Sequence, residues 1–542
     1  MPPLLAGVVS VRQALLALGR VQTAEVLARS GPVPVPVPPV LLEPPDEVSE
    51  SPHPPSKATR SDATKGFCMA GSLRARLRAR IRSVRLGGMK DVEARVFGPE
   101  RGKHASYAGR VRNLTRFMRA PLAFLQERQE ALGDLGPVEL PFGGWLLVSH
   151  PADIEAVLIQ HAGDVLRDEF SHVLERALGK GLLTSDGELW KRQRRLSSAA
   201  FTPKRIRSYA GGMAEVTATG IARLGAGGPV DLHREMSRLT MEVVAAVLFG
   251  ANVGAAQVET VRHSLEVFNS YFAQSPEAIL RLPAWVPTPL NRAVNGATRA
   301  IDTLIYGIIE DRRRAAPRDD LLGALLAAKD EDGSQMSDEQ LRDETVTLFL
   351  AGHETTALSL TYALYLIARH PATEARILAE VAEVVGDRAP TEEDVARLGT
   401  TDRVVKEAMR LYPPAWVTGR EVAKAFELGG SPIPVGTQII MSQWLVHRDP
   451  RWFPNPEVFD PDRFLPDVAR ERPRFAYFPF GGGPRVCIGN HFAMMEATLM
   501  LAMIVRAFRV ELAPFEELRF EPSVTLRPTT RGVRATLVPR AP

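Results

Sequence analysis

The ten residues Phe480-Gly481-Gly482-Gly483-Pro484-Arg485-Val486-Cys487-Ile488-Gly489 carry the most informative pattern in this chain. A single cysteine follows a glycine-rich bend and opens a predicted apolar helix. The dipole at the start of a helix and its unpaired N–H groups favour a thiolate over a thiol, and the amides of Ile488 and Gly489 can donate to the sulfur. Because glycine has no Cβ, a flat and bulky partner can lie close to this backbone. The stretch therefore predicts a soft, anionic ligand.

The same stretch has two other interpretations. A lone cysteine is often an inert, buried side chain, and the residues alone leave that alternative open. A glycine-rich phosphate-binding loop is excluded, because no Gly-Lys-Ser or Gly-Lys-Thr follows the glycines.

The stretch resembles the cysteine-loop signature of the cytochrome P450 superfamily of haem-thiolate monooxygenases. All five fixed positions of that signature are matched, by Phe480, Gly483, Arg485, Cys487 and Gly489. The resemblance implies a bound haem b (iron protoporphyrin IX) with Cys487 as axial ligand of the iron. It also implies that Arg485 meets a haem propionate, that Phe480 packs beneath the loop and that Gly489 adjoins the cofactor. The implied fold is mainly α with a minor β part, and a long central helix crosses the haem.

A second segment, Ala351-Gly352-His353-Glu354-Thr355-Thr356, resembles the oxygen-activation signature of the same family. A glycine inside a helix costs about 1 kcal/mol relative to alanine, so it requires a reason, and room for O2 is one. The resemblance implies that Glu354 and Thr355 are the acid and alcohol that relay protons to O2. Taken alone, the residues also fit a threonine bonded back to the preceding turn beside an exposed glutamate. His353 is interpreted as a bystander.

Further arginines match family positions that contact the haem propionates. Trp190 and Arg194 are four residues apart, so they share one face of a predicted helix, and they match the family's Trp-x-x-x-Arg pattern. Arg420 stands where many members place another propionate ligand. The planar guanidinium fork suits carboxylates. The neighbouring basic residues of the Trp190 helix face either an acidic electron donor or solvent: Lys191, Arg192 and Arg195.

A third group of matches is structural. Glu407 and Arg410 lie three apart on one predicted helical face, which by itself indicates only a weak surface pair. The resemblance implies instead a Glu407–Arg410–Arg463 network behind the haem that supports folding and haem retention. Asp462 occupies a position where glutamate is common in the family, a mild departure.

Local patterns predict the surrounding elements. The longest predicted helix begins with a capping box at Ser337 and Gln340 and runs to His370. The other predicted elements are a hairpin over 137–149, a helix from Pro151 to Gln160, a helix opened by a capping box at Ser185 and Glu188, strands over 433–445, and helices over 404–411 and 487–508.

The composition predicts a globular protein of a reducing compartment. Apolar residues make up 45% and charged residues 24% of the 542 residues, which is ordinary for folded domains. The two cysteines, Cys68 and Cys487, can form neither a disulfide framework nor a cysteine-rich zinc site. No apolar run of about 20 residues lacks charges, as a membrane-spanning helix would. We therefore expect a cytoplasmic protein without a transmembrane anchor.

The N-terminal part of the chain differs from the rest. Residues 31–55 contain ten prolines, typical of an extended spacer, and residues 60–119 contain 16 Lys and Arg against 4 Asp and Glu. We predict a disordered, Pro-rich and Arg-rich extension over 1–106 and a P450 haem domain over 107–542. A basic arm, a targeting segment and a misassigned start are alternatives for the extension. Because the net charge of +4 originates there, the haem domain is not expected to bind nucleic acid.

The resemblance implies a monooxygenase that inserts one atom of O2 into an apolar small molecule, by hydroxylation or epoxidation. No flavin or iron–sulfur motif occurs in the sequence. We therefore expect the electrons of NAD(P)H to arrive through separate partners, a ferredoxin or flavodoxin with its reductase. The apolar segment 413–418 favours a fatty acid, terpenoid, steroid or polyketide as substrate.

The sequence disfavours two other functions. A haem-thiolate isomerase or dehydratase acting on peroxides without a reductase would not need the pair Glu354 and Thr355, which is intact. A non-enzymatic haem sensor or carrier would pair the basic arm with a nucleic-acid-binding module, and no such motif occurs. The sequence leaves the substrate, the regiochemistry, the native redox partner and the oligomeric state open.

Overall fold

The computed structural model describes residues 106–141, 143–251, 254–274, 283–330 and 333–540. Backbone contacts divide the chain into Met1–Asp91 and Val92–Pro542, and all described residues belong to the second unit. The predicted extension, apart from residue 106, lies outside the described residues, so its disorder and its boundary with the haem domain stay predictions.

Helices dominate the described residues, which confirms the predicted mainly α fold with a minor β part. The α-helices are α4 (Tyr107–Arg119), α5 (Pro121–Leu132), α6 (Pro151–Glu155), α7 (Glu169–Val173), α8 (Glu175–Leu178), α9 (Gly187–Ser198), α10 (Pro203–Ser208), α11 (Ala210–Leu224), α12 (Leu232–Leu248), α13 (Ala255–Gln274), α15 (Pro289–Arg314), α16 (Leu321–Ala327), α17 (Asp338–Ala368), α18 (Pro371–Val384), α19 (Glu392–Val395), α20 (Gly399–Leu411), α21 (Gln443–Val446), α22 (Pro466–Arg470) and α23 (Asn490–Ala507). The short helical turns are η1 (Ala156–Gln160), η2 (Ala199–Phe201), η3 (Pro461–Phe464), η4 (Arg474–Ala476) and η5 (Gly483–Arg485).

The strands of the described residues form four small sheets. The largest has five strands in the order β1-β2-β8-β5-β3, in which β2 and β8 are parallel and the other neighbours antiparallel. The others are β4-β12-β9, β6-β7 and β10-β11. The strand bounds are β1 (Leu135–Leu140), β2 (Gly143–Val148), β3 (Val165–Leu166), β4 (Gly228–Asp231), β5 (Thr418–Val422), β6 (Phe426–Leu428), β7 (Ser431–Ile433), β8 (Gln438–Met441), β9 (Phe508–Leu512), β10 (Phe520–Pro522), β11 (Leu526–Pro528) and β12 (Arg534–Pro539).

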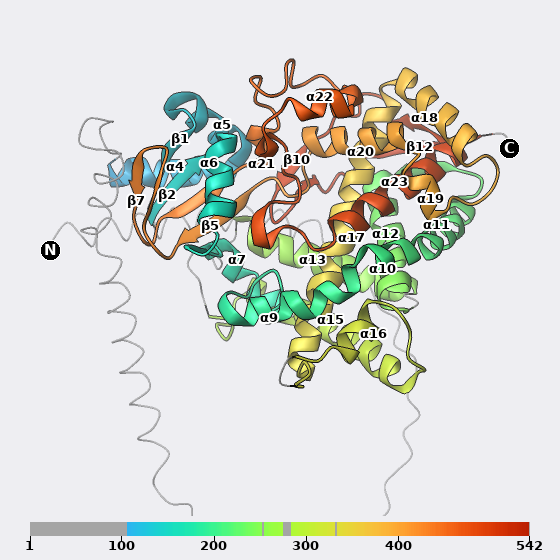
Figure 1. Cartoon of the computed structure of the whole chain (residues 1–542), viewed down its shortest axis with the longest axis horizontal. Coiled ribbons are helices and arrows are strands. Elements are labelled where there is room, and N and C mark those ends of the chain that lie inside the picture. The colour runs from blue at the N-terminus through green and yellow to red at the C-terminus, as the bar shows by residue number, and fades with distance from the viewer. Residues whose placement is uncertain (1–105, 142, 252–253, 275–282, 331–332, 541–542) are drawn as a thin grey trace, which may run out of the picture. The chain divides into compact units, whose positions relative to one another are not determined.

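The long helix α17 is the centre of the helical part (Figure 1). Its 31 residues begin at the predicted capping box, in which Ser337 and Gln340 each accept from the other's backbone amide. The helix packs against α12, α15, α20 and α23 and is buried on nearly all sides, so the largest apolar core surrounds it. The helix ends at Ala368, two residues before the predicted end at His370. His370 stands directly before Pro371, the first residue of α18, and a residue before proline disfavours the helical conformation.

The predicted hairpin is confirmed as β1 paired with β2. The helix opened by Pro151 is confirmed too, and its second half, η1, has the wider π-helical winding. Figure 1 shows α6 beside the strands β1, β2 and β5 of the five-stranded sheet. The sheet contributes two smaller apolar cores.

Two predicted helix starts are wrong. The predicted capping box at Ser185 does not form: Ser185 Oγ donates to Gln193 Oε1 at 2.6 Å, and Asp186 is the residue before α9. The helix predicted from Cys487 begins only at Asn490, because the glycine-rich loop continues through Gly489. Cys487 therefore lies three residues ahead of α23.

Candidate active site

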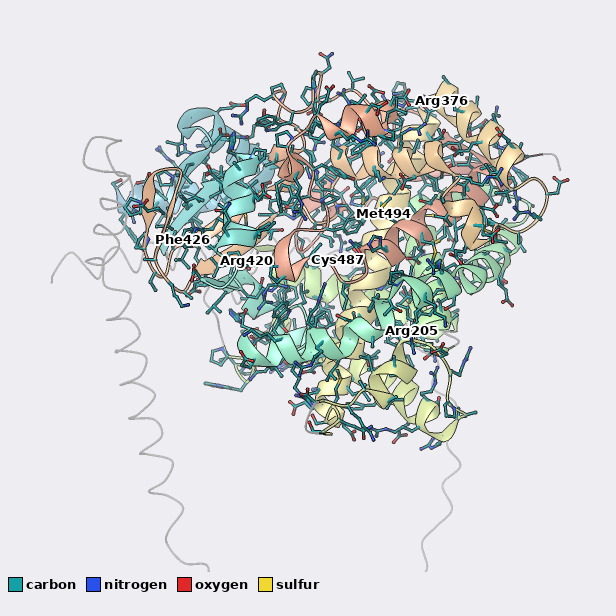
Figure 2. All side chains as sticks on the ribbon, in the orientation of Figure 1. Arg205, Arg376, Arg420, Phe426, Cys487 and Met494 are labelled. Carbon is teal, nitrogen blue, oxygen red and sulfur yellow. The ribbon has the colours of Figure 1, made fainter. Side chains whose placement is uncertain are left out.

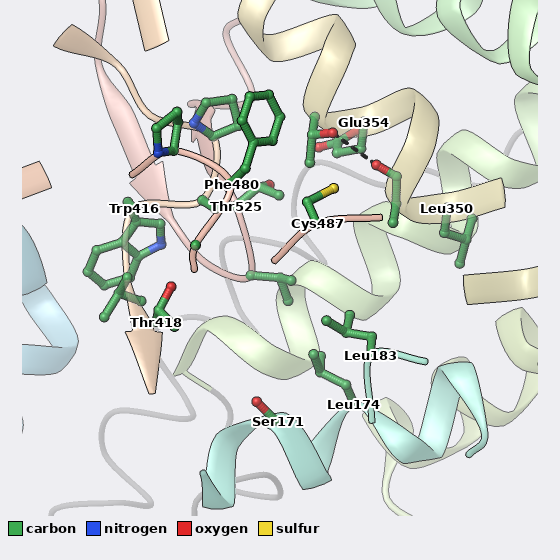
Figure 3. A pocket seen from close by; sticks show the side chains of 18 of the residues that line it. Ser171, Leu174, Leu183, Leu350, Glu354, Trp416, Thr418, Phe480, Cys487 and Thr525 are labelled. Carbon is green, nitrogen blue, oxygen red and sulfur yellow. Dashed lines mark hydrogen bonds between the residues drawn. The ribbon is translucent and has the colours of Figure 1, made fainter. Parts of the chain in front are cut away.

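A cavity of about 570 Å³ lies beside Cys487. Its wall is built from α7, α9, α13, the middle of α17, β5, the cysteine loop and the turn between β10 and β11. Figure 3 shows Cys487, Glu354, Trp416 and Thr525 among the lining residues. The structure brings together all nine residues that the sequence predicts for catalysis or cofactor binding, and each lines this cavity: Trp190, Arg194, Glu354, Thr355, Arg420, Phe480, Arg485, Cys487 and Gly489.

The cysteine loop is held in one shape by its own backbone. The amide of Cys487 donates to the carbonyl of Phe480 at 3.0 Å, which closes the loop. Gly483 has a left-handed φ of +66°, and a Cβ there would stand 1.8 Å from the carbonyl oxygen of Leu158 in η1. Only glycine fits this contact. The loop is thus clamped against η1. Figure 2 labels Cys487 on this loop, just ahead of α23.

The side chain of Cys487 is exposed, and what it faces is the cavity rather than open solvent. Because the surrounding protein replaces most of the water, burial raises the pKa of the Cys487 thiol above its ordinary value. The amide of Gly489 and the guanidinium of Arg194 lower that pKa by less than burial raises it. The amide of Gly489 thus favours the thiolate, as the sequence predicts, but burial opposes the thiolate more strongly. A bound metal cation at the sulfur would remove the proton.

Four arginines line the same cavity. Arg194 donates to the carbonyl of Val486 at 2.9 Å, so it also supports the cysteine loop. Arg485 forms an ion pair with Asp186, and its guanidinium lies 4.3 Å from the ring centroid of Trp190. Arg420 comes from β5, in the five-stranded sheet.

Arg167, directly after β3, is the fourth, and sequence reasoning missed it because no motif surrounds it. Burial, together with the positive charges of Arg420 and Arg485, lowers the pKa of Arg167 to about 9. Burial and Arg485 lower the pKa of Arg420 to about 10. Each lowered pKa indicates a guanidinium group that is removed from water and is not fully compensated by nearby negative charge.

These arginines fit a ligand that carries two carboxylates, as haem does. Within the described ranges, Arg420 is nearly buried and donates only to the carbonyl of Gly419, and Nε of Arg167 is buried without a partner. No ion pair of either side chain is found among the described residues. Buried, unpaired guanidinium groups are costly. Two propionates would supply the missing acceptors, and the sulfur of Cys487 in the same cavity is a suitable iron ligand.

The middle of α17 forms another part of the cavity wall. Glu354 is 8% exposed, and Thr355 Oγ1 donates to the carbonyl of Ala351 at 2.9 Å. Thr355 thus makes the back-bond considered from the sequence, whereas Glu354 is buried beside the cavity rather than exposed. A Cβ at Gly352 would come within 3.3 Å of Val244 on α12. Close packing of α12 against α17 is therefore a second reason for this glycine.

Two fully buried carboxyl groups lie close to this wall. Glu344 on α17 accepts from the amide of Leu182 at 3.2 Å through one oxygen only. Glu496 on α23 lies beside Thr356, whose hydroxyl hydrogen is already donated to the carbonyl of Gly352. Both Glu496 oxygens therefore lack a partner among the described residues. Burial raises the pKa of each carboxyl to about 8, so both are largely protonated at neutral pH.

The predicted three-residue network lies outside the cavity. Arg410 donates to both oxygens of Glu407, at 2.7 and 2.8 Å, and both side chains are fully buried. Arg463 Nε is 3.5 Å from the same carboxyl, and the amide of Asp460 donates to it at 2.9 Å. Burial raises the pKa of Glu407, and the hydrogen bonds from Arg410 oppose that shift. The remaining Arg410 donors bond the carbonyls of His447, Pro456 and Val458.

The basic residues next to Trp190 do not form an unpaired cationic face. Arg192 Nε lies 2.6 Å from Asp330, and Arg195 also pairs with Asp330. Lys191 pairs with Glu188 at 2.7 Å. These partners reduce the charge that the three residues could present to an acidic electron donor.

Comparison with known proteins agrees with this geometry. Residues 107–532 match the family described as cytochrome P450. Cyclooctatin synthase of Streptomyces melanosporofaciens is 40% identical over 75% of this chain and 89% of its own length. Cyclooctat-9-en-7-ol 5-monooxygenase of the same organism is 36% identical over 73% and 86%. A solved structure of cyanobacterial CYP120A1 bound to retinoic acid has a TM-score of 0.69 at 26% identity, covering 77% of this chain and 94% of that one.

The fold and the cavity define a haem-thiolate oxidoreductase. This chain belongs to the cytochrome P450 family. None of the helices in the described ranges has the length and hydropathy needed to cross a bilayer. The cytoplasmic location expected from the sequence stays a prediction.

Proposed function

We propose that this protein is a monooxygenase that inserts one atom of O2 into a largely hydrocarbon, ring-containing substrate of the terpenoid type, by hydroxylation or epoxidation. The observation that carries the proposal is the cavity itself. The only thiol among the described residues, the acid and alcohol of α17 and the arginines that suit two carboxylates all line it. A monooxygenase needs these three kinds of group around one space.

The residues that would hold haem follow from the geometry. Cys487 would ligate the iron, and Arg194, Arg420, Arg485 and Arg167 would share the two propionates. The lining residues Trp190, Phe480 and Gly489 would contact the porphyrin. When bound, haem would supply the activation of O2, and the sulfur of Cys487 would donate electron density to the iron, which favours O–O cleavage.

Two residues of α17 would deliver protons to the site. Thr355 Oγ1 carries a proton at the cavity wall, and its hydroxyl donates a hydrogen bond to the Ala351 carbonyl. Glu354, one residue earlier and nearly buried, is the titratable group that can restore that proton. We interpret the pair as a relay whose alcohol delivers the proton and whose acid replaces it.

The apolar wall supports a hydrocarbon-like substrate. Its members include Leu174, Leu265, Phe268, Phe272 and Trp416. Among the similar proteins, one is named for the oxidation of cyclooctat-9-en-7-ol and one is solved with retinoic acid, both largely hydrocarbon molecules. Wall and relatives together favour a terpenoid over a fatty acid, steroid or polyketide.

Electrons must reach the buried site from outside the chain under this proposal. We propose a ferredoxin or flavodoxin with its NAD(P)H-dependent reductase as donor. The peroxide isomerase alternative is disfavoured, because Glu354 and Thr355 both line the cavity and that chemistry has no use for them. The sensor alternative would equally leave this pair without a task.

Purified holoprotein, mixed with ferredoxin, ferredoxin reductase and NADPH, tests the proposal. A library of cyclic terpenes and terpene alcohols is screened by the substrate-induced shift of the haem absorbance, and the compounds that bind are incubated under ¹⁸O2. We expect a product that carries one ¹⁸O atom. Binding without oxygen incorporation from any compound would contradict the monooxygenase assignment, and a product formed from a hydroperoxide without reductase would favour the isomerase.

A further inference from the structure

One polar side chain interrupts the apolar face that α13 turns toward the cavity. The helix lines the cavity with four residues at the spacing of one helical face: Leu265, Phe268, Asn269 and Phe272. Three are apolar, and Asn269 is the exception. It is only 9% exposed, so its amide is nearly removed from bulk water.

Asn269 is held by a turn from the far end of the chain. Ser523, in the turn between β10 and β11, donates to Asn269 Oδ1 at 3.1 Å and lies 3.3 Å from the backbone carbonyl of Asn269. The turn is itself fixed, because Trp416 Nε1 donates to the Ser523 carbonyl at 3.0 Å and the Ser523 amide donates to the Thr525 carbonyl at 3.0 Å. The Asn269 amide is therefore oriented before any ligand arrives.

The nitrogen of the Asn269 side chain has no hydrogen-bond acceptor among the described residues. Asn269 Nδ2 retains some exposed surface, because the polar atoms that are both fully buried and without a partner do not include it. Because Asn269 lines the cavity, a ligand oxygen there could accept from this donor, which is otherwise unused.

We propose that Asn269, oriented by Ser523, is a specificity-determining residue that binds a hydroxyl group on the substrate. This inference rests on the proposed function and names the substrate more narrowly, as an alcohol with a largely hydrocarbon skeleton. A hydroxyl oxygen accepts from Nδ2 while the skeleton lies against Leu265, Phe268 and Phe272. The reaction that supplies this substrate must therefore leave an oxygen on it before this enzyme acts.

The test compares one ring with and without a hydroxyl group. Cyclododecane and cyclododecanol are titrated into holoprotein, and each Kd is read from the shift of the haem absorbance. The ratio of the two Kd values removes the shared hydrophobic contribution. In Asn269→Leu the preference for the alcohol should fall about tenfold, the factor that corresponds to about 1.4 kcal/mol for a buried hydrogen bond. Ser523→Ala should lower the preference about threefold, because the amide loses its orientation but keeps its donors.

Ser270→Ala is the matched control, since it removes a hydroxyl from the next position of α13, where the side chain is exposed and is not among the residues that line the cavity. Its alcohol preference should equal that of the unmodified protein. An unchanged preference in both Asn269→Leu and Ser523→Ala would overturn the inference and leave the proposed function intact. A loss in Ser270→Ala as large as in Asn269→Leu would show that the preference does not depend on contact with the cavity and would overturn the inference as well. If neither compound shifts the spectrum of the unmodified protein, the apolar cavity assignment fails, and the inference fails with it.

Discussion

Replacing Glu407 by alanine should leave the protein unable to keep its haem. The substitution removes the carboxyl that accepts two hydrogen bonds from Arg410 and one from the amide of Asp460. Arg410 is fully buried, so its charge would stay inside the protein without its partner. Breaking a buried ion pair from one side costs about 3–5 kcal/mol. The orphaned amide of Asp460 adds about 1–3 kcal/mol.

The total is comparable with the whole stability of a folded domain, about 5–15 kcal/mol. We expect Glu407→Ala to be recovered as aggregated or haem-poor protein, measured by the haem-to-protein ratio and by urea unfolding. Arg376→Ala is the control, because the Arg376–Asp462 pair is 44% and 41% exposed and its loss costs about 1 kcal/mol or less. A Glu407→Ala protein with full haem content and the urea midpoint of the control would refute the reasoning.

Three further outcomes are expected. Because the folded pKa of Glu496 is raised to about 8, its contribution to stability is complete below about pH 4.5 and is lost as the pH rises toward 8. Glu496→Gln should therefore gain stability over the unmodified protein by about 1.4 kcal/mol per pH unit in that window, as measured by urea unfolding; a pH-independent difference would count against the shifted pKa. Thr355→Ala should keep haem and substrate binding but release more hydrogen peroxide per NADPH consumed, and an unchanged yield of oxygenated product would remove the hydroxyl from the proton relay. Arg167→Gln combined with Arg420→Gln should speed haem transfer to apomyoglobin at least tenfold, whereas an unchanged rate would exclude both from propionate binding.

The sequence predicted the parts of the site that short motifs carry. Cys487, Arg485 and Phe480 sit within ten residues of each other, and Glu354 with Thr355 lies on one turn of a helix whose capping box is legible at Ser337. Such patterns are local, so neither the path of the intervening chain nor its packing is needed to recognise them.

The parts that were missed depend on tertiary contacts. Arg167 has no motif around it, and Asn269 meets Ser523 across more than 250 residues of chain. The net direction of the pKa shift of Cys487 could not be predicted, because the amides near the helix start are visible in the sequence but the extent of desolvation is not. Ser185 does not cap the helix for a similar reason, because its hydroxyl donates instead to Gln193 Oε1, a buried acceptor eight residues along the chain.

The measurement that tests the central claim most directly is the ferrous–CO absorbance spectrum of the unmodified protein and of Cys487→Ser. If the sulfur of Cys487 is the iron ligand, the unmodified protein gives the strongly red-shifted band of thiolate-ligated haem, and Cys487→Ser loses that band while it retains some haem. A Cys487→Ser protein that keeps the red-shifted band would contradict the ligand assignment and, with it, the reaction proposed for the cavity.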